Sequence, residues 1–192
     1  ELRKCRACVC GNFQDEDPTL QAWTAQAEPS SLYASLKLAR LRKWLISKHD
    51  VKGAFLNASI PDDRVIIVTA PPIWVKWGLV RPGVTWTLDK AVYGLRESPK
   101  WWGDERDARL SEIKYVCKSG KSFMLERCTA DSQLWFLKDA SPNAKRCVLG
   151  ILVVYVDDFM LLAPKGEMRD EFLSSLKKVW TLTKESTFEC GE

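Results

Sequence analysis

Two short apolar runs separated by a pair of acids form the clearest pattern along the chain. Residues 147–156 contain no charged side chain, Asp157 and Asp158 follow, and a second apolar run covers residues 159–163. β-Branched residues are frequent in the first run, and each run is far shorter than the ~18 apolar residues that indicate a membrane-spanning helix. The pattern therefore predicts a β-hairpin within a sheet, with the two acids at its tip.

The two acids raise the question of what neutralises them. Neighbouring carboxylates repel each other by about 4 kcal/mol at ~4 Å and an effective dielectric constant of ~20. A bound cation would remove this repulsion, and Mg²⁺ is typically held by one or two carboxylates together with water and substrate phosphate. An exposed Asp-Asp turn without a ligand explains this stretch equally well, because Asp is a common turn residue.

Periodicity and punctuation predict the remaining elements. Helices are expected over residues 32–46, from Ser98-Pro99 to about residue 114, and over about 168–180. Strands are expected over residues 1–13, 64–69, 73–77, 85–92, 123–126, 134–137 and 180–184. Six Lys or Arg residues lie between residues 37 and 52. They indicate either a solvated helix face or a positive wall that follows a nucleic-acid backbone.

Composition narrows the class of protein. The chain has 192 residues, 46% hydrophobic and 28% charged, as expected of a soluble globular protein with one domain or two close subdomains. Its net charge of +4 is compatible with a polyanionic partner without requiring one. It begins at Glu1 without an initiator Met or a targeting peptide, so we expect a piece of a longer protein.

The cysteines point to a reducing compartment. The chain contains seven, an odd number without the spacing of a disulfide scaffold, so we expect free thiols inside the cell. Cys5, Cys8 and Cys10 resemble part of a zinc site. No fourth ligand is evident nearby, and the single His is His49, so thiols on a strand are the preferred interpretation.

Two further stretches carry candidate chemistry. In DVKGAFLN (50–57), Asp50 precedes core-like residues and is either a cap for the next turn or a metal ligand, while Gly53 permits close backbone approach. In YGLRESPKWW (93–102), a glycine turn leads directly into a helix. The Tyr93-Gly94 pair before that helix offers a surface on which a flat ligand can stack.

Taken together and in order, DVKGAFLN, YGLRESPKWW and YVDD (155–158) resemble the central motifs of reverse transcriptases of copia-type long-terminal-repeat retrotransposons. The start, KCRACVCGNF (4–13), resembles the basic first fingers strand of that family. The resemblance implies an α+β fold, the fingers and palm of a right-hand polymerase, with an antiparallel palm sheet backed by helices. Fingers would cover residues 1–43 and 60–92 and palm residues 44–59 and 93–192. The thumb would be lacking.

The same resemblance implies RNA-directed DNA polymerase activity and assigns the acids. Asp50, Asp157 and Asp158 would be catalytic and would hold the metal, with a backbone contact from Val51. The cofactor would be Mg²⁺, with Mn²⁺ able to substitute, because nucleotidyl transfer uses two ions ~3.5–4 Å apart. Acids so distant in the sequence can converge only if a sheet places their strands side by side.

The resemblance also assigns substrate contacts. Phe55 matches the steric gate that excludes a ribose 2′-hydroxyl, although a plain core aromatic is the other interpretation. Tyr93 and Gly94 match nucleotide-binding positions, and Lys4 and Arg6 are further candidates for triphosphate contacts. Tyr155 and Val156 would lie near the primer end, and together with the acids these residues make up the predicted site.

Partners and context follow from the resemblance as well. We expect an RNA or DNA template, a primer, deoxynucleoside triphosphates and the remainder of a Pol polyprotein, with its thumb, ribonuclease H and integrase, and no membrane. The expected location is intracellular, in cytoplasmic virus-like particles or the nucleus. Glu97-Ser98 stands where Gln-Ala is frequent in the family. The alternative is an inactive or domesticated relic that only binds nucleic acid.

Overall fold

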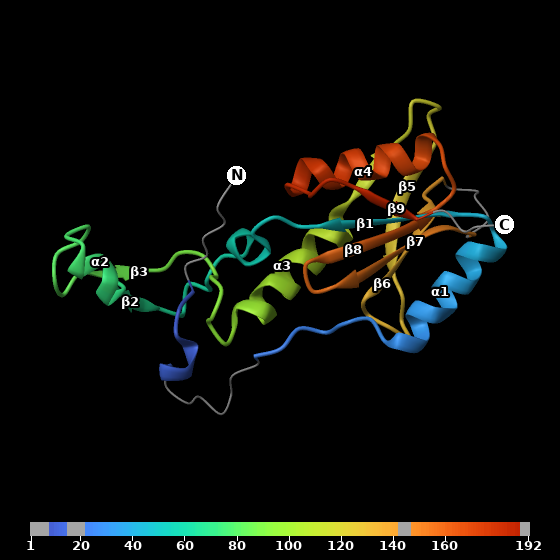
Figure 1. Cartoon of the computed structure of the whole chain (residues 1–192). Helices are drawn as coiled ribbons and strands as arrows, with labels where there is room; N and C mark the ends of the chain where they lie inside the picture. Colours follow the sequence, from blue (N-terminus) through green and yellow to red (C-terminus); the bar gives the residue numbers. More distant parts are fainter. Residues whose placement is uncertain (1–7, 15–21, 142–146, 189–192) are drawn as a thin grey trace. The chain divides into compact units, whose positions relative to one another are not determined.

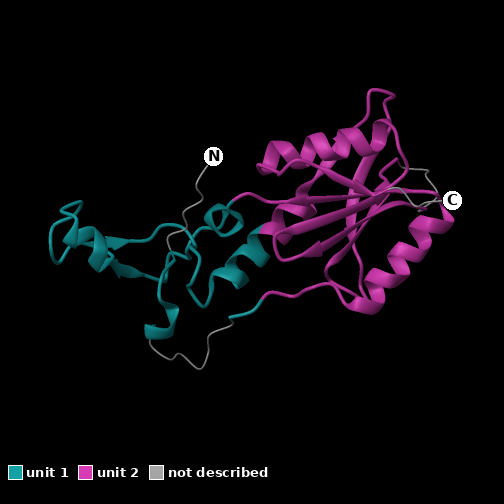
Figure 2. Cartoon of the chain, viewed as in Figure 1, with its two compact units in different colours: residues 1–23, 53–105 teal, residues 24–52, 106–192 magenta. Residues whose placement is uncertain are grey.

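The computed structural model describes residues 8–14, 22–141 and 147–188 (Figure 1). The chain divides into two compact units, each made from two separate stretches of sequence (Figure 2). Unit 1 combines Glu1–Trp23 with Gly53–Glu105, and unit 2 combines Thr24–Lys52 with Arg106–Glu192. These boundaries differ from the subdomain limits expected from the sequence, near residues 43, 59 and 92. The assignment of fingers and palm remains a prediction.

An antiparallel sheet forms the centre of unit 2, and within the described residues it has seven strands in the order β4-β5-β6-β7-β8-β1-β9. The strands are β1 (Leu45–Asp50), β4 (Lys114–Val116), β5 (Ser122–Arg127), β6 (Leu134–Asp139), β7 (Val148–Tyr155), β8 (Asp158–Ala163) and β9 (Ser186–Phe188). The unit also contains α1 (Pro29–Leu41), α4 (Glu167–Val179) and the last part of α3 (Ser98–Glu112). The predicted α+β class with an antiparallel sheet is confirmed.

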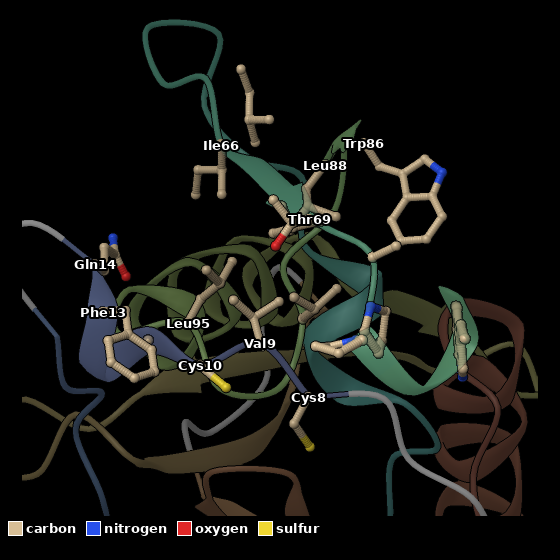
Figure 3. Close-up of a pocket in the computed structure, with 18 residues that line it drawn as sticks. Cys8, Val9, Cys10, Phe13, Gln14, Ile66, Thr69, Trp86, Leu88 and Leu95 are labelled. Carbon is tan, nitrogen blue, oxygen red and sulfur yellow. The ribbon is translucent and has the colours of Figure 1, made fainter. Parts of the chain in front are cut away.

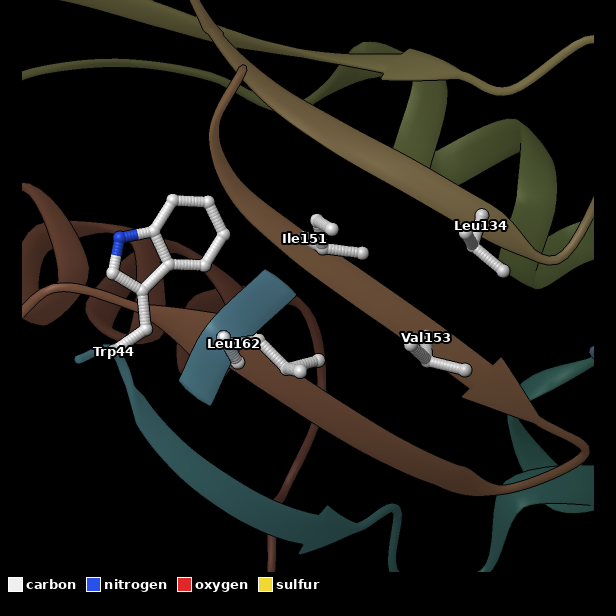
Figure 4. Close-up of a cluster of buried hydrophobic side chains, with 6 residues drawn as sticks. Trp44, Leu134, Ile151, Val153 and Leu162 are labelled. Carbon is white, nitrogen blue, oxygen red and sulfur yellow. The ribbon is translucent and has the colours of Figure 1, made fainter. Parts of the chain in front are cut away.

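The hairpin predicted around the two acids is present as β7 and β8, but only Asp157 lies in the turn, because Asp158 already pairs with Tyr155 as the first residue of β8. Residues 151–154 of β7 are all buried, which is typical of a strand covered on both faces. On one face, Ile151 and Val153 join a cluster with Leu134, Leu162 and Trp44, the last lying between α1 and β1 (Figure 4). Burying one such side chain contributes about 1.5–3 kcal/mol, so this cluster anchors the hairpin in the sheet.

The opposite face of β8 packs on the α4 side of the sheet. Phe159 is fully buried and meets Trp180, which follows α4, in an edge-to-face contact with ring centroids 5.5 Å apart. Phe172 and Leu176 form the buried stripe of α4 at helical spacing. The helix predicted over about 168–180 is therefore confirmed.

Unit 1 contains short elements. They are the 3₁₀ turns η1 (Gly11–Phe13) and η2 (Ala54–Asn57), the paired strands β2 (Ile67–Thr69) and β3 (Thr85–Thr87), helix α2 (Pro72–Lys76) and the start of α3. Helix α3 begins at Ser98 as predicted, and the Ser98 hydroxyl donates to the Val92 carbonyl at 2.7 Å. This bond ties the helix start to the turn before it.

Two predictions about secondary structure are wrong because of local backbone chemistry. Residues 73–77 were expected as a strand, but 73–76 belong to α2 and Trp77 follows it, because Pro72 occupies the first helical turn, where its fixed φ favours a helix. The helix expected over 32–46 begins at Pro29 and ends at Leu41. Lys43 then adopts a positive φ of 53°, and Ile46 lies on β1 instead.

The chain ends also differ from expectation. The strand predicted over 180–184 is replaced by an isolated bridge between Leu182 and Val51, followed by β9. Of the strand predicted over 1–13, residues 1–7 lie outside the described part, and Gly11–Phe13 form a 3₁₀ turn. No helix in the described ranges is long and apolar enough to span a membrane.

Candidate active site

Three predicted site residues form a row across the sheet of unit 2. In the antiparallel register, Asp158 on β8 pairs with Tyr155 on β7 and with Asp50 on β1. Directly paired residues in antiparallel strands lie about 4.5–5.5 Å apart at Cα and point to the same face. The sheet therefore brings Asp50 and Asp158 together, as the sequence analysis required. We call Tyr155, Asp158 and Asp50 the carboxylate row.

Hydrogen bonds fix the backbone at Asp50 on both sides of β1. The Val51 amide donates to the carbonyl of Asp157, the turn residue beside Asp158, at 3.0 Å. On the other side of β1, the Asp50 amide donates to Thr183 Oγ1 at 3.0 Å, and the Thr183 amide donates to the Asp50 carbonyl at 2.8 Å. All three acids are partly buried, so they are fixed by the backbone yet reachable from solvent.

A lysine that the sequence analysis did not single out lies on the same face. Lys48 is two residues before Asp50 on β1, and its Nζ forms an ion pair with Asp158 Oδ2 at 2.9 Å. This hydrogen bond and charge raise the pKa of Lys48 above its ordinary value, and Asp50 and Asp157 raise it further. The sequence contained one sign of this contact: residues two apart on a strand point to the same face, which places Lys48 beside Asp50.

The side chains of the three acids are not arranged as a metal-binding site in this structure. Within the described ranges, no group of three or more His, Cys, Asp or Glu side chains is arranged to hold a metal ion. The chemistry of the donors nevertheless fits a hard cation such as Mg²⁺, which prefers carboxylate oxygens and keeps part of its water shell. The metal contact predicted for Val51 involves its backbone and remains a prediction.

The turn that contains Asp157 and leads into Asp158 has an unusual backbone conformation. Val156 adopts a φ of 54°, which is rare for a β-branched residue. Arg106 on α3, fully buried, donates from Nη1 to the Val156 carbonyl at 2.9 Å. Its Nη2 donates to Gln133 Oε1 at 2.5 Å and forms an ion pair with Asp107 at 2.8 Å. Arg106 thus holds the turn through the backbone carbonyl of Val156.

The sequence also contains a signal for Arg106 outside the recognised motifs. It is four residues from both Trp102 and Leu110, and all three side chains are 0% exposed. An arginine inside a buried helical stripe is unusual, because buried charges need partners. Its sequence neighbour Asp107 is one partner, whereas the Val156 carbonyl and Gln133 contact it only in the folded chain.

The residues predicted at the primer end lie beside the acids. Tyr155 is 52% exposed and stands in the carboxylate row. It also forms an isolated bridge with Gln26. Val156 follows it in the turn and is partly buried. Their contacts with a primer remain predictions.

The predicted nucleotide-binding residues that the structure describes belong to unit 1. Phe55 on η2 and Tyr93 pack against each other with ring centroids 4.7 Å apart. Gly94 has a φ of 97°, and a Cβ there would lie 1.9 Å from the carbonyl oxygen of Val9. Close packing thus explains Gly94 without a ligand, and its nucleotide contact stays a prediction. Lys4 and Arg6 lie outside the described residues.

Unit 1 also contains a pocket of about 710 Å³ (Figure 3). Its lining includes residues 8–11, residues 66–72 with β2, Trp74, and Trp86 of β3. Leu95 and Val9 are among the mostly apolar lining residues. The three predicted catalytic acids are not part of it, so it is a feature separate from the carboxylate row.

Comparison with known proteins agrees with the resemblance seen in the sequence. A Pol polyprotein from the Arabidopsis thaliana transposon RE1, described as retrovirus-related, is 30% identical over 180 residues, or 92% of this chain and 11% of its own length. That from transposon RE2 of the same plant is 29% identical over 163 residues, or 83% of this chain and 10% of its own length. A transposon Ty5-1 protein of Saccharomyces cerevisiae is 27% identical over 133 residues, or 69% of this chain and 37% of its own length.

The chain thus spans well under half of each of these relatives. No solved structure matches it significantly. The family model described as reverse transcriptase (RNA-dependent DNA polymerase) matches residues 4–188, nearly the whole chain. The chain therefore belongs to the reverse transcriptase family.

Proposed function

We propose that this chain is part of the RNA-directed DNA polymerase of a copia-type retrotransposon, and that the carboxylate row with Asp157 is its reaction site. The observation that carries the proposal is the direct pairing of Asp50 with Asp158 on neighbouring strands, in a chain of this family. The sheet of unit 2 would then belong to the palm. The β2–β3 part of unit 1 would belong to the fingers.

In this proposal the acids act through divalent ions. Asp50 and Asp157 would hold two Mg²⁺ ions, with the Val51 backbone and with Asp158 as a nearby third carboxylate. Bound ions would activate the primer 3′-hydroxyl and stabilise the leaving pyrophosphate. The protein supplies fixed positions, since Thr183 holds the backbone of Asp50 and Arg106 holds the turn. Such preorganisation is what phosphoryl transfer chiefly requires of a protein.

Template, primer and deoxynucleoside triphosphate are the proposed substrates, and the rest of a Pol polyprotein is the proposed context. The exposed Tyr155 in the carboxylate row supports a contact with the primer end. Action in a cytoplasmic virus-like particle or the nucleus belongs to the same proposal.

Primer extension on a homopolymeric RNA template with Mg²⁺ or Mn²⁺ tests the reaction. Asp157→Asn is expected to lower incorporation at least about a hundredfold, because metal catalysis contributes several kcal/mol. The matched control is Asp63→Asn, the same change at an exposed acid of unit 1, which should leave incorporation unchanged. Equal incorporation by wild type and Asp157→Asn would contradict the assignment.

Sugar selection by Phe55 is a separate part of the proposal. The contact between Phe55 and Tyr93 supports a ring held in a fixed position, as a steric gate requires. Phe55→Ala is expected to admit ribonucleotides, measured as the ratio of ribonucleotide to deoxynucleotide incorporation. Leu56→Ala, at its exposed neighbour, is the control. An unchanged ratio in Phe55→Ala would leave Phe55 only the role of packing against Tyr93.

A relic that binds nucleic acid without synthesis is the second candidate. The observation that favours it is the ion pair of Lys48 with Asp158, which places a protein cation among the acids. Under this alternative the wild-type chain would bind a primer–template duplex and incorporate no nucleotide with either ion. Incorporation that depends on Asp157 excludes it.

A further inference from the structure

Lys48 occupies a defined place on the face that carries the acids. On β1 it pairs with Met160 of β8, one row away from the pair of Asp50 and Asp158. Residues two apart on a strand share a face, so Lys48 lies beside Asp50 and diagonally opposite Asp158. Its Nζ reaches Asp158 Oδ2 at 2.9 Å along that diagonal. The contact therefore follows from strand register and does not depend on a loop.

The surroundings of this ion pair differ along the same face. One row beyond Lys48, Ile46 pairs with Leu162 and packs on the apolar cluster with Trp44. Lys48 is thus placed where the apolar part of the face ends and the acidic part begins. Its positive charge is directed to the acids, because the other direction is apolar and would not stabilise it.

The ion pair is accessible enough to exchange. The side chain of Lys48 is 49% exposed, and that of Asp158 is 34% exposed. Ion pairs with this exposure are weak, since water and salt screen them. A divalent ion attracts a carboxylate more strongly than an ammonium does at the same distance, because its charge is twice as large.

We propose that Lys48 is a built-in counter-ion of the acids, which neutralises them in the metal-free protein and competes with the divalent ions that they bind. The inference rests on the proposed function, because it assumes that the acids hold ions. Lys48 acts through Asp158 and its neighbours, so it is a positioning residue. Lys48 thereby sets the concentration of divalent ion at which the acids become occupied.

The proposal predicts an effect on ion affinity that does not depend on catalysis. Removing the positive charge of Lys48 from beside the acids should tighten the binding of a divalent ion about tenfold, because water and salt screen the repulsion between exposed charges. The probe is Mn²⁺ alone, titrated into the chain and followed by the electron paramagnetic resonance signal of the free ion. Lys48→Gln should lower the dissociation constant for Mn²⁺ about tenfold relative to wild type.

Three further variants separate charge, position and site. Lys178→Gln removes the same charge from an exposed position on α4 and should leave the dissociation constant within about twofold of wild type. Lys48→Arg keeps the charge and should also retain wild-type affinity. Asp157→Asn should abolish the binding. A second readout is the melting temperature: without metal Lys48→Gln should melt below wild type, and Mg²⁺ should raise its melting temperature more than that of wild type.

The outcomes distinguish this inference from the proposed function. If Mn²⁺ binds with a requirement for Asp157, and Lys48→Gln leaves the affinity unchanged or weakens it, the counter-ion proposal is overturned and the metal site stands. If neither wild type nor Lys48→Gln shows binding that requires Asp157, the proposed metal site fails and the inference fails with it. If Lys48→Gln binds Mn²⁺ more tightly than wild type while Lys178→Gln and Lys48→Arg do not, both the metal site and the counter-ion proposal are supported.

Discussion

The two faces of β1 place similar polar side chains in opposite surroundings. Ser47 and His49 are 0% and 1% exposed and lie on the α4 side, where Arg169 donates to Ser47 Oγ at 3.0 Å. Lys48, which is exposed, and Asp50, which is partly buried, alternate with them. The buried pair is held by protein groups, whereas the other pair faces Asp158 and solvent.

The six residues of β1 therefore contribute to the folded core on one face and to the candidate site on the other. On the α4 side, Ser47 serves as a partner for both Arg169 and His49, so its polar atom is used internally. On the other side the ion pair of Lys48 with Asp158 is partly exposed to solvent. A shift of one residue in the pairing of β1 with β8 would exchange the faces, so register must be strictly specified here.

The largest effect is expected from truncating a buried side chain on the α4 side of the sheet. Phe159→Ala should lower the free energy of unfolding by about 3–5 kcal/mol, since Phe159 is fully buried against Trp180. Met160→Ala, at the next residue on the other face, should cost less than about 2 kcal/mol because Met160 is only partly buried. Urea unfolding measures both. Equal losses would show that the two faces are equally important for folding.

The next effect concerns the turn at the end of both faces. Arg106→Met should lower the free energy of unfolding by about 3 kcal/mol, because Asp107 and the Val156 carbonyl lose a buried partner. The control is Arg127→Met, which removes a second partner of Asp107 from a side chain that is 43% exposed. It should cost at most about 1 kcal/mol. A similar loss in the two variants would argue against a special role for the buried guanidinium.

The smallest effect is the pH dependence of folding stability that arises from His49 on the α4 side of β1. Burial, the largest cause, holds the pKa of His49 below its ordinary value of 6.5; Arg169 and Lys177 add to this, and Glu185 opposes it. Below pH ~6.5 the unfolded chain therefore binds a proton that the folded chain does not, so stability falls as the pH decreases. The slope should not exceed about 1.4 kcal/mol per pH unit.

Urea unfolding at pH 7.5 and 5.5 tests this directly, because the chain has one histidine. His49→Gln should unfold with a smaller pH dependence than wild type over that range. The same dependence in both proteins would show that other groups are responsible.

How far the sequence could predict this molecule depends on the range of the interactions. The β7–β8 hairpin was predictable, because an apolar run, two acids and a second run are local features. The helix from Ser98 was predictable for the same reason, since the Ser-Pro start is local. Residues 73–77 misled because their apolar side chains suit a strand, while Pro72 favours a helix.

The site was only half predictable. The motifs pointed to Asp50, Asp157 and Asp158, and strand register then placed Asp50 opposite Asp158. Lys48 and Arg106 were missed, because their importance comes from partners on other elements, namely Asp158 and the Val156 carbonyl. No motif records such contacts, although alternation on β1 and the buried stripe of α3 contain traces of them.

The order of the units along the chain has a genetic consequence. The chain passes from one unit to the other after Trp23, Lys52 and Glu105, so each unit is encoded in two separate segments. A single crossover between two diverged copies of this gene would always leave at least one unit with segments of different parentage. Hybrids whose units both remain intact require at least three crossovers, after Trp23, Lys52 and Glu105, so that Thr24–Lys52 and Arg106–Glu192 are inherited together.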